Sequence, residues 1–331
     1  MKRILPYEIP PVETYQSDAF FLGICLSYNR SKNVYINRFI NLQCNNSISM
    51  KQIDIRFANS LWGDLYNEGT GELNLFHFCN YNMTTLIKFM EERIDQNCYL
   101  LLYEVDEYYL SYTDSYKKKH YKHDTYIYGY DDDNFYIVAY SNKRLQKLEV
   151  NKKEIVNSVL KTNINDIDNF CSFRINQAAN ILIDVKSIIN GLHNYCDGES
   201  GYDDTSFVYG INVWNVVIES INSLNERKQF EEKELDLRIM RLIWEHKKSM
   251  CYRLEQLNDK EIEISDVILE KLREIEKQAY LAFQLFFKYM IENNHSRDKL
   301  DKIERIYRRL REQEKELYPQ IIDILEKNLN A

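Results

Sequence analysis

The pattern of hydrophobic and polar positions changes near residue 150. Before it, short segments rich in Tyr, Ile and Phe lie between Asn, Asp and Gly residues, which is typical of strands and short helices. Beyond it, long charged segments carry apolar residues at helical spacing. The pattern therefore predicts an α+β protein, with a sheet-containing half over residues 1–150 and a helical half over 151–331.

Within the first half, the apolar spacing predicts a helix over 85–94 and a buried strand over 98–105. Two further strands are expected at 124–130 and 134–140. The acidic stretch 131–133 between them lies where a hairpin turn is needed, so these two strands should pair antiparallel.

The second half reads as an antiparallel helical bundle, because each long segment carries a single apolar stripe. Ser265 and Ser296 are the candidate N-caps of its last two helices. A packing domain and a homodimer surface are both compatible with such stripes. The helices are expected over 172–192, 211–224, 225–257, 265–293 and 296–328.

Composition narrows the class of protein. The 331 residues are 44% hydrophobic and 28% charged, which is enough apolar material for a full core. No apolar run is long enough to span a membrane and no signal peptide is recognisable, so we expect a soluble, cytoplasmic protein without a membrane partner. A net charge of -8 argues against nucleic acid as a partner.

The seven cysteines are odd in number, scattered and without a C-x-x-C pair, unlike a disulfide framework or a zinc ribbon. Cys25 has the best setting for a nucleophile. A helix over 26–43 would start near it and direct the positive end of its dipole at the sulfur. A buried core cysteine is the alternative at this position.

Two of the six histidines form the pair His120-x-x-His123. On a strand, side chains three residues apart point to opposite faces, so these two do not easily share a metal ion. His123, at the strand entrance, better suits a general base. No metal site and no resident cofactor is predicted.

Three segments, 101–110, 120–132 and 244–254, resemble the papain-like cysteine protease homologues of the butirosin-biosynthesis type. The resemblance implies a papain-like catalytic half with an antiparallel sheet. It also implies a cysteine-dependent acyltransferase, which moves an acyl group from a carrier-protein thioester to an amine or diamine in antibiotic (nonribosomal peptide-like) biosynthesis. No cofactor is implied beyond the phosphopantetheine that arrives on the acyl or peptidyl carrier protein.

Carried over residue by residue, the family nucleophile falls on Cys25 and the family histidine on His123. The following strand has Ala139 where an orienting Asp is common, so Asp106 is the candidate third member and Asn142 the second. A solvated Asp that closes a strand is the alternative for Asp106. The side-chain donor of an oxyanion hole stays open, because neither Gln16 nor Asp18 has the family spacing.

A basic run, Lys117, Lys118, Lys119 and Lys122, lies directly before His123 in an otherwise acidic chain. It is a candidate docking surface for an acidic carrier protein, and an ordinary solvated loop is the alternative. Two other functions stay open for the whole chain. One is a catalytically degenerate papain-like scaffold that binds a peptide or carrier protein, and the other is an intracellular cysteine peptidase or amidase.

Overall fold

The chain folds into two compact units, and it passes from one to the other more than once. A computed structural model describes residues 2–45, 53–58, 71–76, 82–142, 144–161, 170–199, 206–226, 237–259, 262–292 and 297–330. Unit 1 comprises Met1–Lys32 and Leu61–Ile181, and unit 2 comprises Asn33–Ser60 and Leu182–Ala331. Each unit is described by itself.

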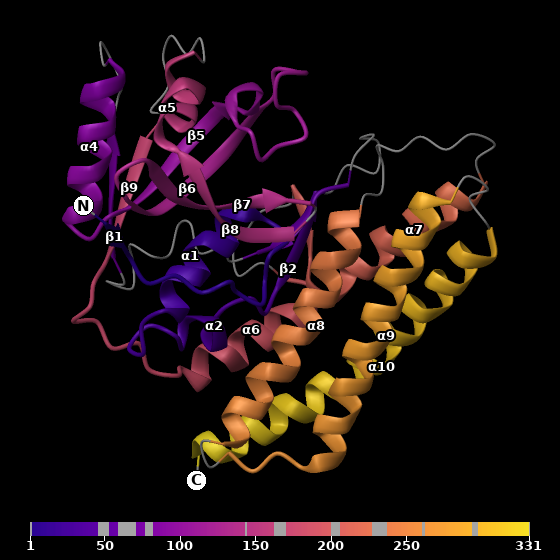
Figure 1. Ribbon diagram of the computed structural model, residues 1–331. Coiled ribbons are helices and arrows are strands. Elements are labelled where there is room, and N and C mark those ends of the chain that lie inside the picture. The colour runs from indigo at the N-terminus through magenta and orange to yellow at the C-terminus, as the bar shows by residue number, and fades with distance from the viewer. Residues whose placement is uncertain are drawn as a thin grey trace. The chain divides into compact units, whose positions relative to one another are not determined.

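Unit 1 is built on a seven-stranded antiparallel sheet with the order β4-β9-β5-β6-β7-β8, and the short β1 pairs with β6 (Figure 1). The strands are β1 (Arg3–Ile4), β4 (Gly71–Phe76), β5 (Tyr99–Asp106), β6 (Lys122–Tyr130), β7 (Asn134–Ser141), β8 (Arg144–Asn151) and β9 (Phe170–Ile175). The helices are α1 (Gln16–Leu26), α4 (Met83–Asp95), the single 3-10 turn η1 (Glu107–Tyr109) and α5 (Lys152–Leu160).

Helix α1 covers one face of this sheet. The ring of Phe20 packs on Tyr126 of β6 with centroids 4.5 Å apart, and Phe21 meets Phe173 of β9 edge to face at 5.2 Å. On the opposite face, Phe89 of α4 packs against Phe170 at 5.4 Å. Because side chains alternate along a strand, odd-numbered residues from 123 to 127 on β6 point away from α1.

Unit 2 is mainly helical. Its elements are α2 (Val34–Asn37), β2 (Leu42–Asn45), β3 (Ile55–Phe57), α6 (Val185–Asp197), β10 (Phe207–Tyr209), η2 (Gly210–Asn212), α7 (Val213–Glu226), α8 (Leu237–Asn258), α9 (Asp266–Ile291) and α10 (Arg297–Asn330). The three short strands form a small antiparallel sheet in the order β10-β2-β3. The apolar stripes of α9 and α10 point into the bundle, as their spacing predicts, with Leu272 and Leu310 fully covered.

A buried ionic cluster lies in the core of unit 2. Lys247 on α8 forms an ion pair with Glu314 on α10, and both side chains have no exposed surface. The other Glu314 oxygen accepts hydrogen bonds from Tyr195 Oη at 2.8 Å and from Trp214 Nε1 at 2.6 Å. Tyr318 Oη donates to the first oxygen at 3.0 Å. Four donors therefore hold one carboxylate between α6, α7, α8 and α10.

The mixed α+β class is confirmed, but two predicted boundaries are wrong. Residues 172–175, the start of the helix predicted over 172–192, belong instead to β9, which inserts between β4 and β5, so the sheet extends past residue 150. Of the helix predicted over 26–43, only the four-residue α2 (Val34–Asn37) forms, because α1 ends at Leu26 and β2 follows from Leu42. Both errors concern apolar runs that helix and strand could share.

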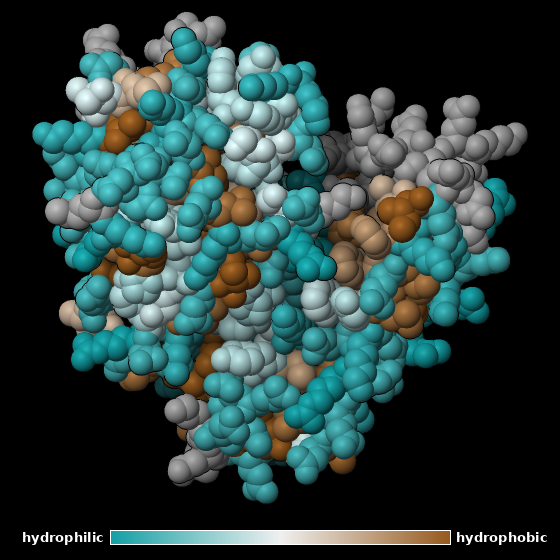
Figure 2. Space-filling view, viewed as in Figure 1, coloured by the Kyte–Doolittle hydropathy of each residue, from teal (hydrophilic) through white to brown (hydrophobic). Residues whose placement is uncertain are grey.

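The surface of unit 2 carries hydrophobic side chains among polar ones, and brown residues are visible on its helices in Figure 2. Helix α9 exposes five large apolar side chains, those of Val267, Tyr280, Leu281, Phe287 and Ile291. The homodimer surface stays a prediction. Among the helices of the described residues, none is both long and apolar enough to cross a membrane.

Candidate functional site

Cys25 does not lie at the start of a helix. It is the second-to-last residue of α1, in the turn where the helix dipole is negative, and that end of the dipole does not favour a thiolate. Its side chain has no exposed surface. The expected activation of Cys25 by a helix N-terminus is therefore wrong, because α1 begins nine residues earlier, at Gln16.

His123 lies on the other side of the sheet. On β6 it shares a face with Thr125, whereas the neighbouring Tyr126 carries the contact with α1. Cys25 sits on α1, about 13 Å further along the helix axis than Gln16. The sheet therefore stands between the Cys25 thiol and the His123 imidazole, and the predicted nucleophile–base pair is not brought together.

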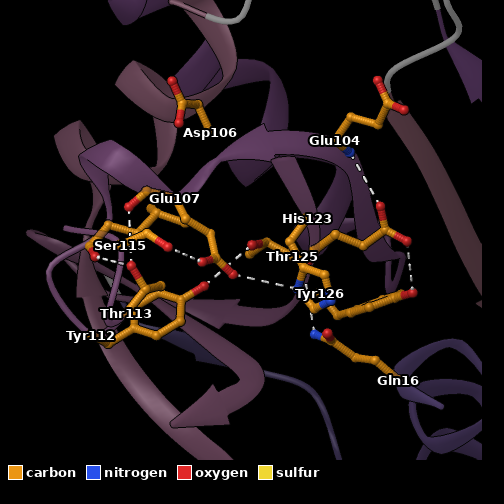
Figure 3. A network of polar contacts seen from close by, with 12 residues as sticks. Gln16, Glu104, Asp106, Glu107, Tyr112, Thr113, Ser115, His123, Thr125 and Tyr126 are labelled. Atoms are coloured by element: carbon orange, nitrogen blue, oxygen red, sulfur yellow. Dashed lines mark hydrogen bonds and ion pairs between the residues drawn. The ribbon is translucent and has the colours of Figure 1, made fainter. Parts of the chain in front are cut away.

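His123 is paired with a glutamate instead. Its Nδ1 is 3.6 Å from Glu107 Oε1, and the imidazole keeps 42% of its surface exposed (Figure 3). The second Glu107 oxygen accepts a hydrogen bond from Ser115 Oγ at 2.9 Å, which fixes the carboxylate. With Nδ1 facing the carboxylate, Nε2 is the ring nitrogen left to accept a proton from a bound molecule.

Asp106 is paired with the other histidine. Its Oδ2 is 2.6 Å from His120 Nδ1, and its Oδ1 accepts the backbone N–H of Tyr108 at 3.0 Å, which caps η1. The strands β5 and β6 run antiparallel as expected, but Val105 rather than Asp106 stands opposite His123. The prediction that Asp106 orients His123 is therefore wrong, because a shift of one residue moves a side chain to the other face.

The remaining predicted site residues have structural positions. Asn142 occupies the turn between β7 and β8 with φ of 51°, a left-handed conformation that Asn tolerates better than most residues. Ala139 is buried within β7. Among the described residues, no hydrogen bond joins either of them to a histidine ring.

The start of α1 meets the start of β6 at a different pair of residues. Gln16 Nε2 donates to the backbone carbonyls of Asp124 at 3.4 Å and Val138 at 3.2 Å (Figure 3). Asp124 accepts hydrogen bonds from Glu104 N at 3.1 Å and from Tyr126 Oη at 3.4 Å. The junction between the helix and the sheet thus presents an amide and a carboxylate, not a thiol and an imidazole.

Five other cysteines of the described residues are poor nucleophiles, because burial disfavours their thiolate forms. Burial raises the pKa to about 12 for four of them, those of Cys44, Cys171, Cys196 and Cys251. Burial also raises the pKa of Cys98. None of these five is a thiolate near neutral pH, so they offer no replacement for Cys25.

The two acid–histidine pairs come from one short stretch. Asp106 ends β5 and Glu107 begins η1, while His120 and His123 flank the entrance to β6. Glu107 N also donates to Tyr121 O at 2.9 Å, so the neck of the intervening loop is closed by backbone as well as side chains. The sequence patterns identify Asp106, His120 and His123 but not Glu107. The adjacent acidic residues at 106 and 107 are the signal that could have identified it.

The predicted docking lysines divide into two kinds. Lys122 forms an ion pair with Glu104 at 3.4 Å. Lys117, Lys118 and Lys119 are exposed residues of the loop before β6. In the part of the chain that the structure describes, no group of three acidic, histidine or cysteine side chains is close enough to hold a metal ion.

We expect Asp106→Ala to lower the free energy of unfolding by about 2–3 kcal/mol, because it removes two hydrogen bonds from a carboxylate that is nearly covered. Urea denaturation followed by circular dichroism measures this change. Asp114→Ala, an exposed carboxylate in the same loop, is the matched control. Equal midpoints for the two variants would show that Asp106 does not hold the loop.

No protein-family model matches this chain, and no curated protein matches it either. The papain-like resemblance therefore rests on the quoted segments alone and stays a prediction.

Proposed function

We propose that the chain transfers an acyl group from a carrier-protein thioester to an amine, with His123 as the general base and without a covalent cysteine intermediate. The observation that carries this proposal is the His123–Glu107 pair, a half-exposed imidazole with a carboxylate at 3.6 Å behind it. Such a pair holds one tautomer of the ring and stabilises the imidazolium that forms when it takes a proton. At 3.6 Å the contact is longer than a hydrogen bond, and catalytic contacts are often this long before substrate binds.

The chemistry is direct aminolysis. The amine nitrogen attacks the thioester carbonyl carbon, a C–N bond forms, and the C–S bond breaks. His123 Nε2 takes the proton that the attacking nitrogen loses and returns it to the departing thiolate of the carrier arm. Glu107, placed behind the ring, offsets the positive charge that the imidazole gains.

The papain-like description of unit 1 belongs to the same proposal. It is supported by a helix that packs on one face of an antiparallel sheet, with its first residue bonded to the entrance of the histidine strand. Unit 1 differs from the papain-like arrangement in two ways. The helix begins with Gln16 instead of a cysteine, and His123 points away from the helix. A covalent mechanism of the papain type therefore does not follow from this architecture, whereas base catalysis does not require it.

A second candidate function is a binding scaffold without acyl transfer. The observation that favours it is the same junction, where Gln16 and Asp124 stand in place of a thiol and an imidazole. A scaffold would bind an acylated carrier protein and release it unchanged. Incubating the chain with acylated carrier and amine, and measuring amide by mass spectrometry, separates the two functions.

We expect Cys25→Ala to keep most of the transfer rate of the unchanged chain, because the thiol is covered, lies in the last turn of α1 and is separated from His123 by the sheet. Intact-protein mass spectrometry should find no acyl adduct on the unchanged chain. A thioester adduct that maps to the peptide containing Cys25, together with loss of activity in Cys25→Ala, would restore the covalent mechanism and exclude direct aminolysis.

A further inference from the structure

Three consecutive lysines, Lys117, Lys118 and Lys119, form an exposed cationic loop directly before β6. Among the described residues, no carboxylate lies within ion-pair distance of any of them, whereas Lys122 is neutralised by Glu104. Three unneutralised cations in one loop stand out in a chain whose net charge is -8. Their field is available to an anion outside the chain.

The loop that carries these lysines is ordered by its own hydrogen bonds. The backbone N–H of Lys117 donates to Tyr108 O at 3.0 Å, and those of Lys118 and Lys119 donate to Ser115 O at 3.0 and 3.1 Å. The backbone of the three residues is therefore set before a ligand arrives, so binding has to order only their side chains.

Aromatic rings and the acid–histidine pair hold the loop further. Lys117 Nζ lies 5.0 Å from the centroid of Tyr116, and Lys119 Nζ lies 5.0 Å from that of Tyr121. At the end of the loop, His120 stacks on Tyr108 with centroids 4.4 Å apart while Asp106 binds its Nδ1. The three lysines therefore belong to an ordered loop rather than to a flexible segment.

The cationic loop is adjacent to the proposed base. Lys119 precedes His123 by four residues, and the loop closes where Glu107 N meets Tyr121 O. Lys119 Nζ lies 5.0 Å from the centroid of Tyr121, and that ring stacks on His123 with centroids 6.1 Å apart, so an anion held at Lys119 would lie one ring away from His123. Lysine binds phosphate oxygens as a compact point charge, without the planar geometry that arginine requires.

We propose that Lys117, Lys118 and Lys119 bind the phosphate ester of the donor's pantetheine arm and so direct the thioester toward His123. This inference rests on the proposed function for the identity of the donor. Nucleic acid fits less well, because tight binding of a phosphate backbone uses many more cations than three and the rest of the chain is acidic. The gain is electrostatic, so salt should screen it.

The test compares two ligands that differ only in the phosphate, 4'-phosphopantetheine and pantetheine. Isothermal titration calorimetry on the full chain at low salt should show about tenfold tighter binding of the phosphorylated arm, a modest advantage because exposed charges interact weakly. The variant with Lys117→Ser, Lys118→Ser and Lys119→Ser should lose this advantage. Lys122→Ser, in which the replaced lysine is already paired, is the matched control and should keep it.

The outcomes separate the site from the function. Equal binding of the two ligands, or equal losses in the triple variant and in Lys122→Ser, would overturn the phosphate site even if amide forms. Competition by inorganic phosphate at the same concentration as the arm would assign the site to free phosphate and overturn the role of the arm. If the phosphorylated arm is preferred but no amide is ever formed, the site stands and acyl transfer falls.

Discussion

Replacing His123 with alanine should lower the rate of amide formation by about 10² to 10⁴, the contribution that a well-placed general base makes to proton transfer. The loss should appear mainly in kcat, because the imidazole acts on the attacking nitrogen in the transition state rather than on the bound donor. The measurement is steady-state transfer from an acylated carrier to a simple primary amine, with amide quantified by mass spectrometry.

The chain supplies a matched control for this substitution. His193 on α6 also contacts a glutamate, Glu326, at 3.1 Å and is 47% exposed, so His193→Ala removes an equally solvated imidazole with a similar partner. It should leave the rate unchanged. Glu107→Gln should reduce the rate less than His123→Ala, since it removes the charge behind the ring and not the base itself. If His123→Ala and His193→Ala behave alike, His123 is not the base.

The second large effect concerns stability. Glu314→Gln should lower the free energy of unfolding by about 3–5 kcal/mol, because it leaves the buried Lys247 ammonium without its counter-charge. It also directs an amide N–H at side chains that already donate, those of Tyr195, Trp214 and Tyr318. Burial lowers the pKa of Lys247, which shows that its charged form depends on Glu314 rather than on water for stabilisation.

Urea denaturation followed by circular dichroism measures this loss, and Glu312→Ala is the control on the same helix. Glu312 is an exposed carboxylate paired with Arg311 and Lys315, and its removal should not move the midpoint measurably. A double variant with Lys247→Met and Glu314→Leu should lose less than the sum of the two single changes, because the two residues interact directly. Strict additivity would show that the ion pair contributes no coupling.

In this site, a shift of one residue along the chain decides which carboxylate pairs with which histidine. Asp106 ends β5 and Glu107 begins η1, and the two neighbours contact different histidines. Positions 123 and 124 are neighbours on β6 and point to opposite faces of the sheet. His123 therefore meets Glu107, whereas Asp124 accepts the hydroxyl of Tyr126 on the face that α1 covers. The spacing of residues in a motif cannot tell which carboxylate meets which histidine, because this depends on the face of the sheet to which each side chain points.

The sequence by itself determined the elements whose signals are local. The helix predicted from Ser265 to 293 is α9, from Asp266 to Ile291, and the one predicted from Ser296 to 328 is α10, from Arg297 to Asn330. The hairpin at 131–133 forms as expected, with Asp131 Oδ1 accepting the backbone N–H groups of Asp133 and Asn134. Turn residues and apolar periodicity act within a few residues, so they can be read without a fold. Of the two predicted N-caps, Ser265 precedes α9 without a capping hydrogen bond from its side chain, and Ser296 lies outside the described residues.

Only the tertiary structure decided the rest. Whether residues 170–175 form a helix or a strand depended on the gap between β4 and β5, which no local signal records. The face that His123 presents and the carboxylate that reaches it depend on the register between β5 and β6, which lie about 20 residues apart in the chain. The burial of Cys25 depends on the packing of α1 against β6, about 100 residues away. Long-range pairing supplies the free energy for these choices, so the same residues permit several sites and the fold selects one.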